Sequence, residues 1–305
     1  MSAVDQIHLN FNPEALQALN LILGIVMFGV ALDLRVEDFR RVLRAPLAPA
    51  IGLCCQFLLM PAFASLLVLL LKPAPSMALG IILVAACPGG NVSNFFTSLG
   101  RGNAALSVSM SAISTLFSIV MTPFNFMFWG RLNPHTAELL RTIELAPSQI
   151  LSTVLVILVI PTIAGMLTAH FRPQWASRML RPMRLLSVAF MLIFILGALA
   201  ANFSNFIQYI GATFWIVFSV NATALLLGYG VSRLVRLSPR DARAVCFETG
   251  IQNSAFGLLL IFNFFGGLGG MALVAAWWGV WHLVSGLSLA LLWSRRPPTL
   301  SPAPA

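Results

Sequence analysis

Charged residues are scarce in this sequence. Only 9% of its 305 residues are charged and 59% are hydrophobic, whereas a soluble domain carries about 25% charged residues. A chain of this length has too few charged side chains to cover a soluble surface. The composition therefore predicts a polytopic membrane protein.

Motifs that bind nucleotides or activate nucleophiles are also missing. The sequence has no Walker loop, no dinucleotide fingerprint and no nucleophile elbow. The cysteines lie inside apolar runs without metal-ligand spacing. An enzyme is the least favoured interpretation, although a lone Glu near a His could do acid–base work. If the protein moves a solute uphill, an ion gradient is the expected energy source.

Long apolar segments are abundant, and a helix needs about 20 such residues to cross a bilayer. About nine segments qualify. They lie roughly at residues 16–33, 47–71, 75–99, 103–128, 147–170, 183–202, 209–232, 240–264 and 271–294. The sequence thus predicts an all-α polytopic membrane protein.

The basic residues cluster in alternate connections between these segments. Only Lys72, Arg131 and Arg141 fall on the opposite side from all the others. Because cytoplasmic loops are enriched in Lys and Arg, this bias predicts that the N-terminus is outside and the C-terminus inside. Residues 1–15 would form an extracytoplasmic tail without signal-peptide features, and 295–305 a cytoplasmic tail. The net charge of +9 is then loop charge, and we expect no nucleic acid partner.

Two of the segments are interrupted near their middle. The first reads "CPGGNVSN" around Pro88, and the second reads "ETGIQNSAF" around Gly250. Irregular backbone at membrane depth occurs only where it is buried in protein or lines a cavity. The two segments run in opposite directions, so the pattern predicts two inverted repeats with crossing discontinuous helices and a binding site between them.

Each break creates two helix ends inside the membrane. Free carbonyl groups at the end of a half-helix attract cations, and free N–H groups at the start of the next attract anions. Glu248 is the one acidic residue well inside a predicted span, and an ionisable residue there indicates function. A neutral, hydrogen-bonded Glu is the alternative.

Other polar side chains occur in nearby spans. Four serines recur at helical spacing on one face of span 103–128, either as neighbours of Glu248 or as packing residues. They are Ser107, Ser111, Ser114 and Ser118. Gln56 alone would indicate an interhelical hydrogen bond, and His282 a packing, proton-relay or substrate-contact residue. We expect Trp277 and Trp278 to belong to an interfacial aromatic belt.

Several motifs together resemble the bile acid:sodium symporter family. They are "MFGVALDL", "CCQFLLMP", "CPGGNVSNFFTSLGRGNAALSVSMSAISTL" and "ETGIQNSAF". The resemblance runs from about residue 16 to 294. It implies a core domain at 47–128 and 209–294, with broken helices at 75–99 and 240–264, beside a panel domain at 16–46 and 147–202. Compared with ten-span members, the first repeat lacks its first helix.

The resemblance also implies two sodium sites and one substrate site. The first sodium site would use Ser93, Asn94, Ser107, Ser111 and Glu248. The second would use Gln56, Glu248, Gln252 and the backbone around Thr249 and Ile251. Substrate would lie near Asn91, Asn253, Ser254 and His282. Some relatives have Thr in place of Ser111, and some have Asn where this chain has Leu283.

These expectations converge on a sodium-coupled symporter of an organic anion, working by alternating access in the bacterial inner membrane. Bile-acid-like, pantoate-like and other small carboxylates remain open as substrates. A proton-coupled carrier using Glu248 and His282 is the first alternative. A passive channel or a membrane receptor that only binds its ligand is the second. The bilayer and the solute are the expected partners, and no obligatory protein partner is evident.

Overall fold

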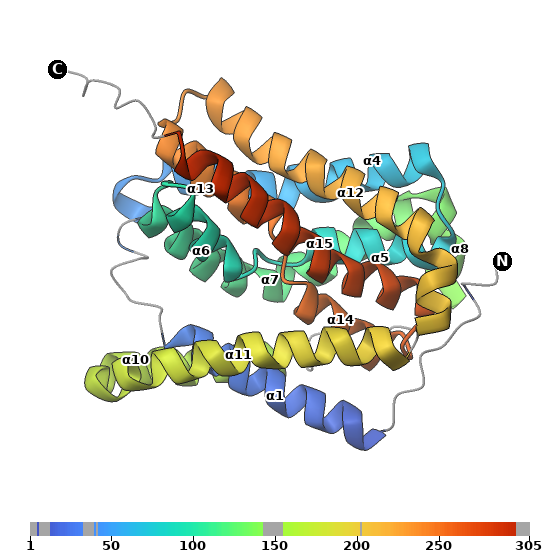
Figure 1. Ribbon diagram of the computed structural model, residues 1–305, viewed down its shortest axis with the longest axis horizontal. Coiled ribbons are helices and arrows are strands. Elements are labelled where there is room, and N and C mark those ends of the chain that lie inside the picture. Colours follow the sequence, from blue (N-terminus) through green and yellow to red (C-terminus); the bar gives the residue numbers. More distant parts are fainter. Residues whose placement is uncertain are drawn as a thin grey trace.

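Figure 1 shows the computed structural model of the chain. The structure describes Asp5 and residues 13–32, 40, 42–142, 155–201 and 203–296. Parts of the predicted spans, at residues 33, 147–154 and 202, lie outside these described residues. Within the described residues there is no β-strand, and almost every residue is helical.

The helices follow the predicted segments closely. They are α1 (Pro13–Ala31), α3 (Leu47–Cys54), η2 (Cys55–Leu59), α4 (Met60–Leu71), α5 (Pro75–Ala86), α6 (Val92–Leu99), α7 (Ala104–Leu132), α8 (Pro134–Thr142), η3 (Leu155–Val159), α10 (Ile160–Phe171), α11 (Pro173–Ala201), α12 (Phe203–Leu234), α13 (Pro239–Gly250), α14 (Ser254–Phe264) and α15 (Gly269–Ser294). Here η2 and η3 are single π-helical turns that continue directly into α4 and α10.

Four stretches of the described residues are long and apolar enough to cross a bilayer. They are Leu47–Leu71, Ala104–Leu132, Thr213–Leu234 and Gly269–Ser294. Shorter apolar helices, among them α5 and α14, pack between them. Large apolar side chains on the outside of these helices, such as Val120 and Leu226, are mostly exposed, as expected for a surface that faces lipid. This is the architecture of an all-α membrane protein, while the total of nine spans and the inverted repeats stay predictions.

Both predicted helix breaks are confirmed. Helix α5 ends at Ala86 and α6 begins at Val92, with Pro88 between them. Helix α13 ends at Gly250 and α14 begins at Ser254. The first break follows from proline chemistry, since Pro88 has no N–H to donate to the preceding turn.

The two breaks meet and pair through their backbones. Gly90 donates its N–H to the carbonyl of Ile251 at 2.6 Å, and Asn253 donates to the carbonyl of Pro88 at 2.9 Å. Between them, Gly89 forms an isolated antiparallel bridge with Gln252. The pairing satisfies polar backbone groups that would otherwise be unpaired in the buried interior of the helix bundle.

The glycines of the first break are required by this close approach. A Cβ added to Gly90 would lie 3.0 Å from the carbonyl oxygen of Gln252, and one added to Gly89 would collide with the carboxylate of Glu248. Glycine therefore allows the two chains to cross at backbone contact distance.

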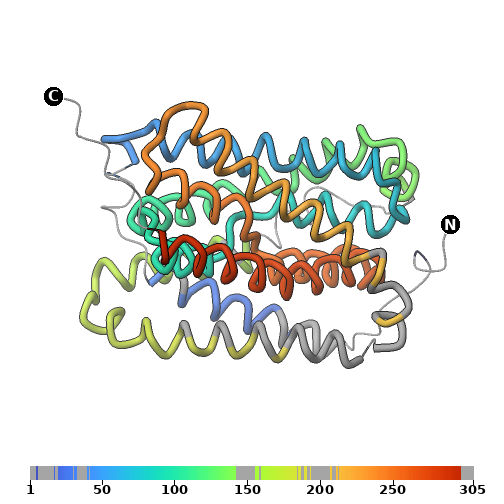
Figure 2. Tube along the Cα trace, turned by 45° about the horizontal axis from the view of Figure 1, so that its top comes forward, coloured from blue at the N-terminus to red at the C-terminus, as the bar shows by residue number. Residues whose placement is uncertain are grey.

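The helices form two groups. Helices α1, α10 and α11 pack on one another as one layer, and the other helices form a thicker layer beside it (Figure 1). Figure 2 shows the same separation from a second direction. The layers share apolar packing, because Leu23 and Met27 of α1 belong to the main apolar cluster of the thicker layer, and polar contacts add to it. Asn20 of α1 and Asn263 of α14 exchange amide hydrogen bonds of 3.1 and 2.8 Å, and Met166 of α10 packs with Ala31 and Ala112.

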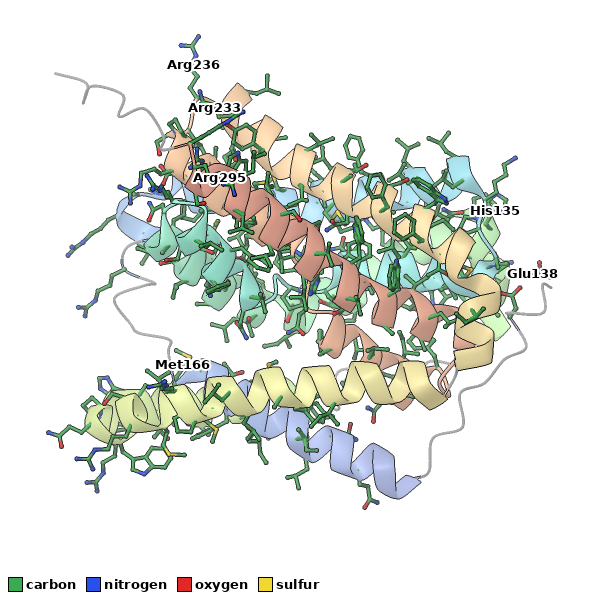
Figure 3. All side chains as sticks on the ribbon, viewed as in Figure 1. His135, Glu138, Met166, Arg233, Arg236 and Arg295 are labelled. Carbon is green, nitrogen blue, oxygen red and sulfur yellow. The ribbon has the colours of Figure 1, made fainter. Side chains whose placement is uncertain are left out.

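The two ends of the bundle carry different kinds of charged and titratable side chains. Figure 3 places Arg233, Arg236 and Arg295 at one end of the long helices, and His135 and Glu138 at the other.

Two expectations of the sequence analysis are wrong in detail. Helix α11 begins at Pro173, well before residue 183, so most of the basic connection that we expected there is helical. Trp278 is fully buried in the main apolar cluster, while Trp277 is partly buried against it. The belt interpretation of Trp278 is therefore wrong, because a belt residue faces the membrane interface.

Candidate functional site

Glu248 lies two residues before the end of α13 and is only 1% exposed. Its Oε2 accepts hydrogen bonds from the hydroxyls of Ser93 at 2.7 Å and Ser111 at 2.8 Å. Its Oε1 accepts from Ser114 at 3.3 Å. A buried carboxylate without partners would cost several kcal/mol. These hydroxyls come from α6 and α7, so Glu248 joins three helices.

A second set of oxygen atoms adjoins this carboxylate. The side-chain oxygen of Asn94 accepts from Ser107 at 2.7 Å and from Ser111 at 3.2 Å. The hydroxyl of Ser107 also accepts from Thr97 at 3.2 Å. Ser111 therefore bridges Glu248 and Asn94. Glu248 and the other four residues that the resemblance assigned to the first sodium site thus form one hydrogen-bonded cluster, which we call the carboxylate cluster.

Some residues of the serine face of α7 are neighbours of Glu248, and another bonds only within its own helix. Ser111 and Ser114 both donate to Glu248, whereas Ser118 donates to the carbonyl of Thr115 within its own helix. All four serines of the face are buried. Ser114 belongs to the serine face that the sequence predicts, and it adds a partner of Glu248 to those that the family resemblance implies.

Gln56 and Gln252 form a glutamine pair on the other side of the break. Gln56 donates from Nε2 to Gln252 Oε1 at 2.8 Å and to the carbonyl of Cys87 at 2.7 Å. Gln252 donates from Nε2 to the carbonyl of Thr249 at 2.7 Å. Both glutamines are 0% exposed. The pair therefore holds carbonyl groups at the ends of both first half-helices.

Local structure explains how Gln56 reaches the break. It lies in the π-helical turn η2, shortly before Pro61. Proline cannot donate to the carbonyl four residues earlier, that of Phe57, and Asn125 of α7 donates to this carbonyl instead at 2.9 Å. Single π-helical turns often occur at functional sites because they change which side chains face inward.

Gly89 connects the carboxylate cluster with the glutamine pair. It lies against the carboxylate of Glu248 and forms the backbone bridge to Gln252. Of the two backbone positions expected in the second sodium site, the Ile251 carbonyl accepts from Gly90 and the Thr249 carbonyl accepts from Gln252. Thr249 turns its hydroxyl to the carbonyl of Val245, within its own helix.

The residues expected at the substrate lie at the starts of the second half-helices and on α15. Asn91 precedes α6 and is exposed. Asn253 caps α14 by accepting from the N–H of Phe256 at 3.1 Å. Ser254 is 2% exposed, and its hydroxyl has no hydrogen-bond partner. It is therefore a buried polar group without a partner, which is uncommon in native proteins.

His282 is 3% exposed, and both of its ring nitrogens lack hydrogen-bond partners. It lies one turn before Gly286, where an added Cβ would be 2.9 Å from Ile251 Cδ1. Residues four apart share a helix face, so His282 is on the side of α15 that faces the crossing. No hydrogen bond joins His282 to Ser254 among the described residues.

Sequence reasoning missed two residues that hold the ends of the first half-helices. Asn221 of α12 donates to the carbonyl of Gly250 at 2.8 Å and accepts from Ser285 of α15 at 2.7 Å. Thr122 of α7 donates to the carbonyl of Ala86 at 2.7 Å. A lone Asn in an apolar helix is a visible signal, but nothing in the sequence shows which carbonyl it meets.

The donor set indicates which ligands could bind here. The carboxylate cluster and the glutamine pair offer carboxylate, hydroxyl, amide and carbonyl oxygens, which suit hard cations such as sodium. The N-terminal ends of α6 and α14 carry partial positive charge, which suits an anion, while the N–H groups of Ser93, Asn94, Ser254 and Phe256 have acceptors within the chain. Among the described residues, no group of three or more His, Cys, Asp and Glu side chains could hold a metal ion.

The chain is similar to proteins that are named as sodium-dependent transporters or cotransporters. The chain is 32% identical to an uncharacterized sodium-dependent transporter, YocS, of Bacillus subtilis (strain 168), over 278 residues that cover 91% of this chain and 83% of the relative. It is 33% identical to the probable chloroplastic sodium/metabolite cotransporter BASS2 of Oryza sativa subsp. japonica, over 78% of this chain and 55% of the relative. It is 29% identical to the ileal sodium/bile acid cotransporter of Homo sapiens, over 77% of this chain and 66% of the relative.

The chain thus spans most of the bacterial relative and between about half and two thirds of the plant and human ones. The profile of the Sodium Bile acid symporter family matches residues 20–209. This match and the bacterial relative confirm the resemblance that the sequence motifs indicated. The chain therefore belongs to the sodium bile acid symporter family, a family of membrane transporters.

Proposed function

We propose that this protein is a sodium-coupled symporter that carries an organic anion by alternating access. The observation that carries the proposal is Glu248, a carboxylate buried at the crossing of two broken helices and surrounded by oxygen-bearing side chains. The family and the names of the relatives support sodium dependence.

Sodium would bind at two places that share Glu248. The first is the carboxylate cluster, where Ser93, Asn94, Ser107 and Ser111 supply further oxygens. The second lies between Glu248 and the glutamine pair, near the carbonyl groups of Thr249 and Ile251. Each ion would offset the negative charge of Glu248, so that an anion could enter the same region at lower electrostatic cost.

The anion would bind at the starts of α6 and α14. These N-terminal ends carry partial positive charge. Asn91, Asn253 and Ser254 lie at them, and His282 is on the face of α15 that turns toward the crossing. The two unpartnered side chains, Ser254 and His282, would then donate to the solute. A carboxylate-bearing solute fits this chemistry, whether bile-acid-like, pantoate-like or another small organic acid.

The two layers of helices would move relative to each other. The layer of α1, α10 and α11 would be the panel domain, and the layer with the crossing would be the core domain, as the ranges expected from the sequence suggest. Such a movement would slide Leu23 and Met27 of α1 across the apolar surface of the core layer, with which they share a buried cluster. The arginines at one end of the bundle (Figure 3) support an N-out, C-in orientation in the bacterial inner membrane.

Uptake by proteoliposomes tests the proposal. We expect uptake of a bile-acid-like or small carboxylate anion to require an inward sodium gradient and to be lost in Glu248→Gln. The matched control is Glu138→Gln, which changes an exposed acid on α8 and should leave uptake intact. Undiminished uptake with choline in place of sodium contradicts the proposal. Uptake driven by a pH jump alone instead supports the proton-coupled alternative with Glu248 and His282.

A further inference from the structure

Arg243 of α13 is a buried basic residue with an unusual set of partners. It is 6% exposed, and no carboxylate pairs with it among the described residues. Its Nη1 donates to the carbonyl of Gly100 at 2.8 Å and to that of Trp293 at 3.3 Å, and its Nη2 donates to the carbonyl of Arg296 at 2.8 Å. The guanidinium carbon also lies 5.2 Å from the centre of the Trp293 ring.

The three carbonyl groups lie at or just beyond helix C-termini. Gly100 is the residue after α6, Trp293 is in the last turn of α15, and Arg296 follows that helix by two residues. Helix C-termini carry partial negative charge, and the Trp293 carbonyl accepts from the Arg296 N–H as well as from Arg243. The ends of two helices thus take the place of a carboxylate counter-ion for Arg243. The guanidinium in turn holds both helix ends to α13. The planar fork of Arg suits several acceptors at once, which a Lys ammonium does not.

The contacts of Arg243 and the carboxylate cluster lie toward opposite ends of the same two half-helices, α6 and α13. On α13, Glu248 follows Arg243 by five residues, which is about 7.5 Å along a helix. On α6, Ser93 is in the first turn and Gly100 follows the last one. Ser93 donates to Glu248 at one end, and Arg243 holds Gly100 at the other.

The middle of this helix pair is packed apolar surface. The rings of Phe96 and Phe247 are 6.1 Å apart, and the Phe247 ring is 5.3 Å from that of Trp293. A Cβ added to Gly100 would lie 3.0 Å from Phe247. Helix α6 has eight residues and is preceded by the glycines of the first break. Its two ends and this aromatic contact hold it against α13, while Asn94 and Thr97 hydrogen-bond it to α7 and Phe96 packs on Gly286 of α15.

We infer that Arg243 is a positioning residue for cation binding: by fixing the end of α6 to α13, it sets Ser93 and Asn94 at the distance from Glu248 that the cation requires. The inference rests on the proposed function of the carboxylate cluster. Arg243 touches neither the ion nor the solute. It acts through the two half-helices, as partners outside the ligand shell do in metal sites.

A second connection to α13, made by Asn103, should keep an Arg243 variant folded, so that the inference can be tested. Asn103 donates from its side chain to Asp241 at 2.7 Å and from its backbone to the carbonyl of Arg240 at 2.9 Å. Asn103 is the N-cap of α7, so the chain just after α6 stays attached to α13 when Arg243 is replaced. We expect an Arg243 variant to fold but to hold α6 less accurately.

The test measures the sodium concentration that gives half of the maximal thermal stabilisation of purified protein. Sodium chloride is titrated against choline chloride at constant ionic strength, with no organic anion present. We expect Arg243→Gln to raise this concentration by roughly tenfold or more. Arg243→Lys should restore part of the affinity because it keeps the charge. Arg240→Gln, an exposed arginine on the same helix, should match the wild type.

The outcomes separate the inference from the proposed function. A wild type that sodium does not stabilise, or a Glu248→Gln variant with unchanged sodium dependence, contradicts the proposed function itself. If both behave as proposed but Arg243→Gln melts at a lower temperature with an unchanged sodium midpoint, Arg243 is only structural and the inference is overturned. If Arg243→Gln cannot be purified folded, Arg243→Lys decides, and a wild-type sodium midpoint in that variant overturns the inference.

Discussion

Ser111→Ala should remove about a quarter to almost half of the stabilisation that sodium gives to this protein, whereas Glu248→Gln should remove all of it. Ser111 is 3% exposed and contacts Glu248 and Asn94 at 2.8 and 3.2 Å, so it belongs to the first proposed site. Glu248 belongs to both sites. The difference between the two variants therefore tests whether two ions share one carboxylate.

The magnitude follows from linkage. A ligand at 100 times its dissociation constant stabilises the native state by about 2.7 kcal/mol, so two such sites contribute about 5.4 kcal/mol. A hydrogen bond to a charged group is worth about 1.5–3 kcal/mol, and each 1.4 kcal/mol is about tenfold in affinity. Losing the Ser111 hydroxyl should weaken the first site by roughly tenfold to a hundredfold. At the hundredfold limit that site contributes only about 0.4 kcal/mol.

The assay is unfolding of the purified protein over a range of sodium concentrations, with choline keeping the ionic strength constant. For wild type, the dependence of the unfolding free energy on sodium concentration should fit two binding sites. Ser111→Ala should fit one strong and one weak site, and Glu248→Gln should show no sodium dependence. Gln56→Ala should weaken sodium binding at the second proposed site. The reasoning is refuted if Ser111→Ala keeps the full sodium dependence, or if Ser111→Ala and Gln56→Ala each abolish it completely, because the ions would then not bind at separable places.

Two further predictions concern the crossing and the contact between the layers. Gly89→Ala should abolish sodium-dependent uptake, because its Cβ collides with the Glu248 carboxylate, while Gly211→Ala, where a Cβ meets nothing within 4 Å, should transport normally; active Gly89→Ala protein would show that the crossing tolerates separation. Asn20→Ala and Asn263→Ala should each lower the free energy of unfolding by about 1–3 kcal/mol. A double-mutant cycle should give a coupling of at least about 0.5 kcal/mol, and additive effects would mean that the amide pair contributes no direct interaction.

Much of the site was visible in the sequence because polar residues are conspicuous in apolar spans. Pro88 and Gly250 marked the breaks, and Glu248 was exceptional by charge alone. The partners were harder to predict because they are distant along the chain. Ser93 and Glu248 are 155 residues apart, and Gln56 and Gln252 are 196 apart. The family resemblance supplied these groupings, since no local pattern fixes which polar side chains of separate helices meet.

Other features had no local signal at all. Trp278 has the composition expected of an interfacial residue, yet the rotation of α15 turns it into the core. The contacts of Asn221 depend on how α12 packs against α13 and α15. The early start of α11 at Pro173 places arginines in a helix, where charge suggested a loop. In each case tertiary packing decides, and hydropathy does not report it.

The backbone pairing of the two breaks also has a consequence for how the protein is made. The carbonyl of Pro88 and the N–H of Gly90 find their partners only in the second break, and the hydroxyl of Ser93 finds Glu248 only there. When the first broken helix leaves the ribosome, none of these partners has been synthesised, and an unpaired backbone group in hydrocarbon costs several kcal/mol. We therefore expect residues 88–91 to stay in a wet or protein-shielded setting until α13 and α14 arrive. Completion of the crossing, late in synthesis, would then be the step that commits the chain to its native membrane structure.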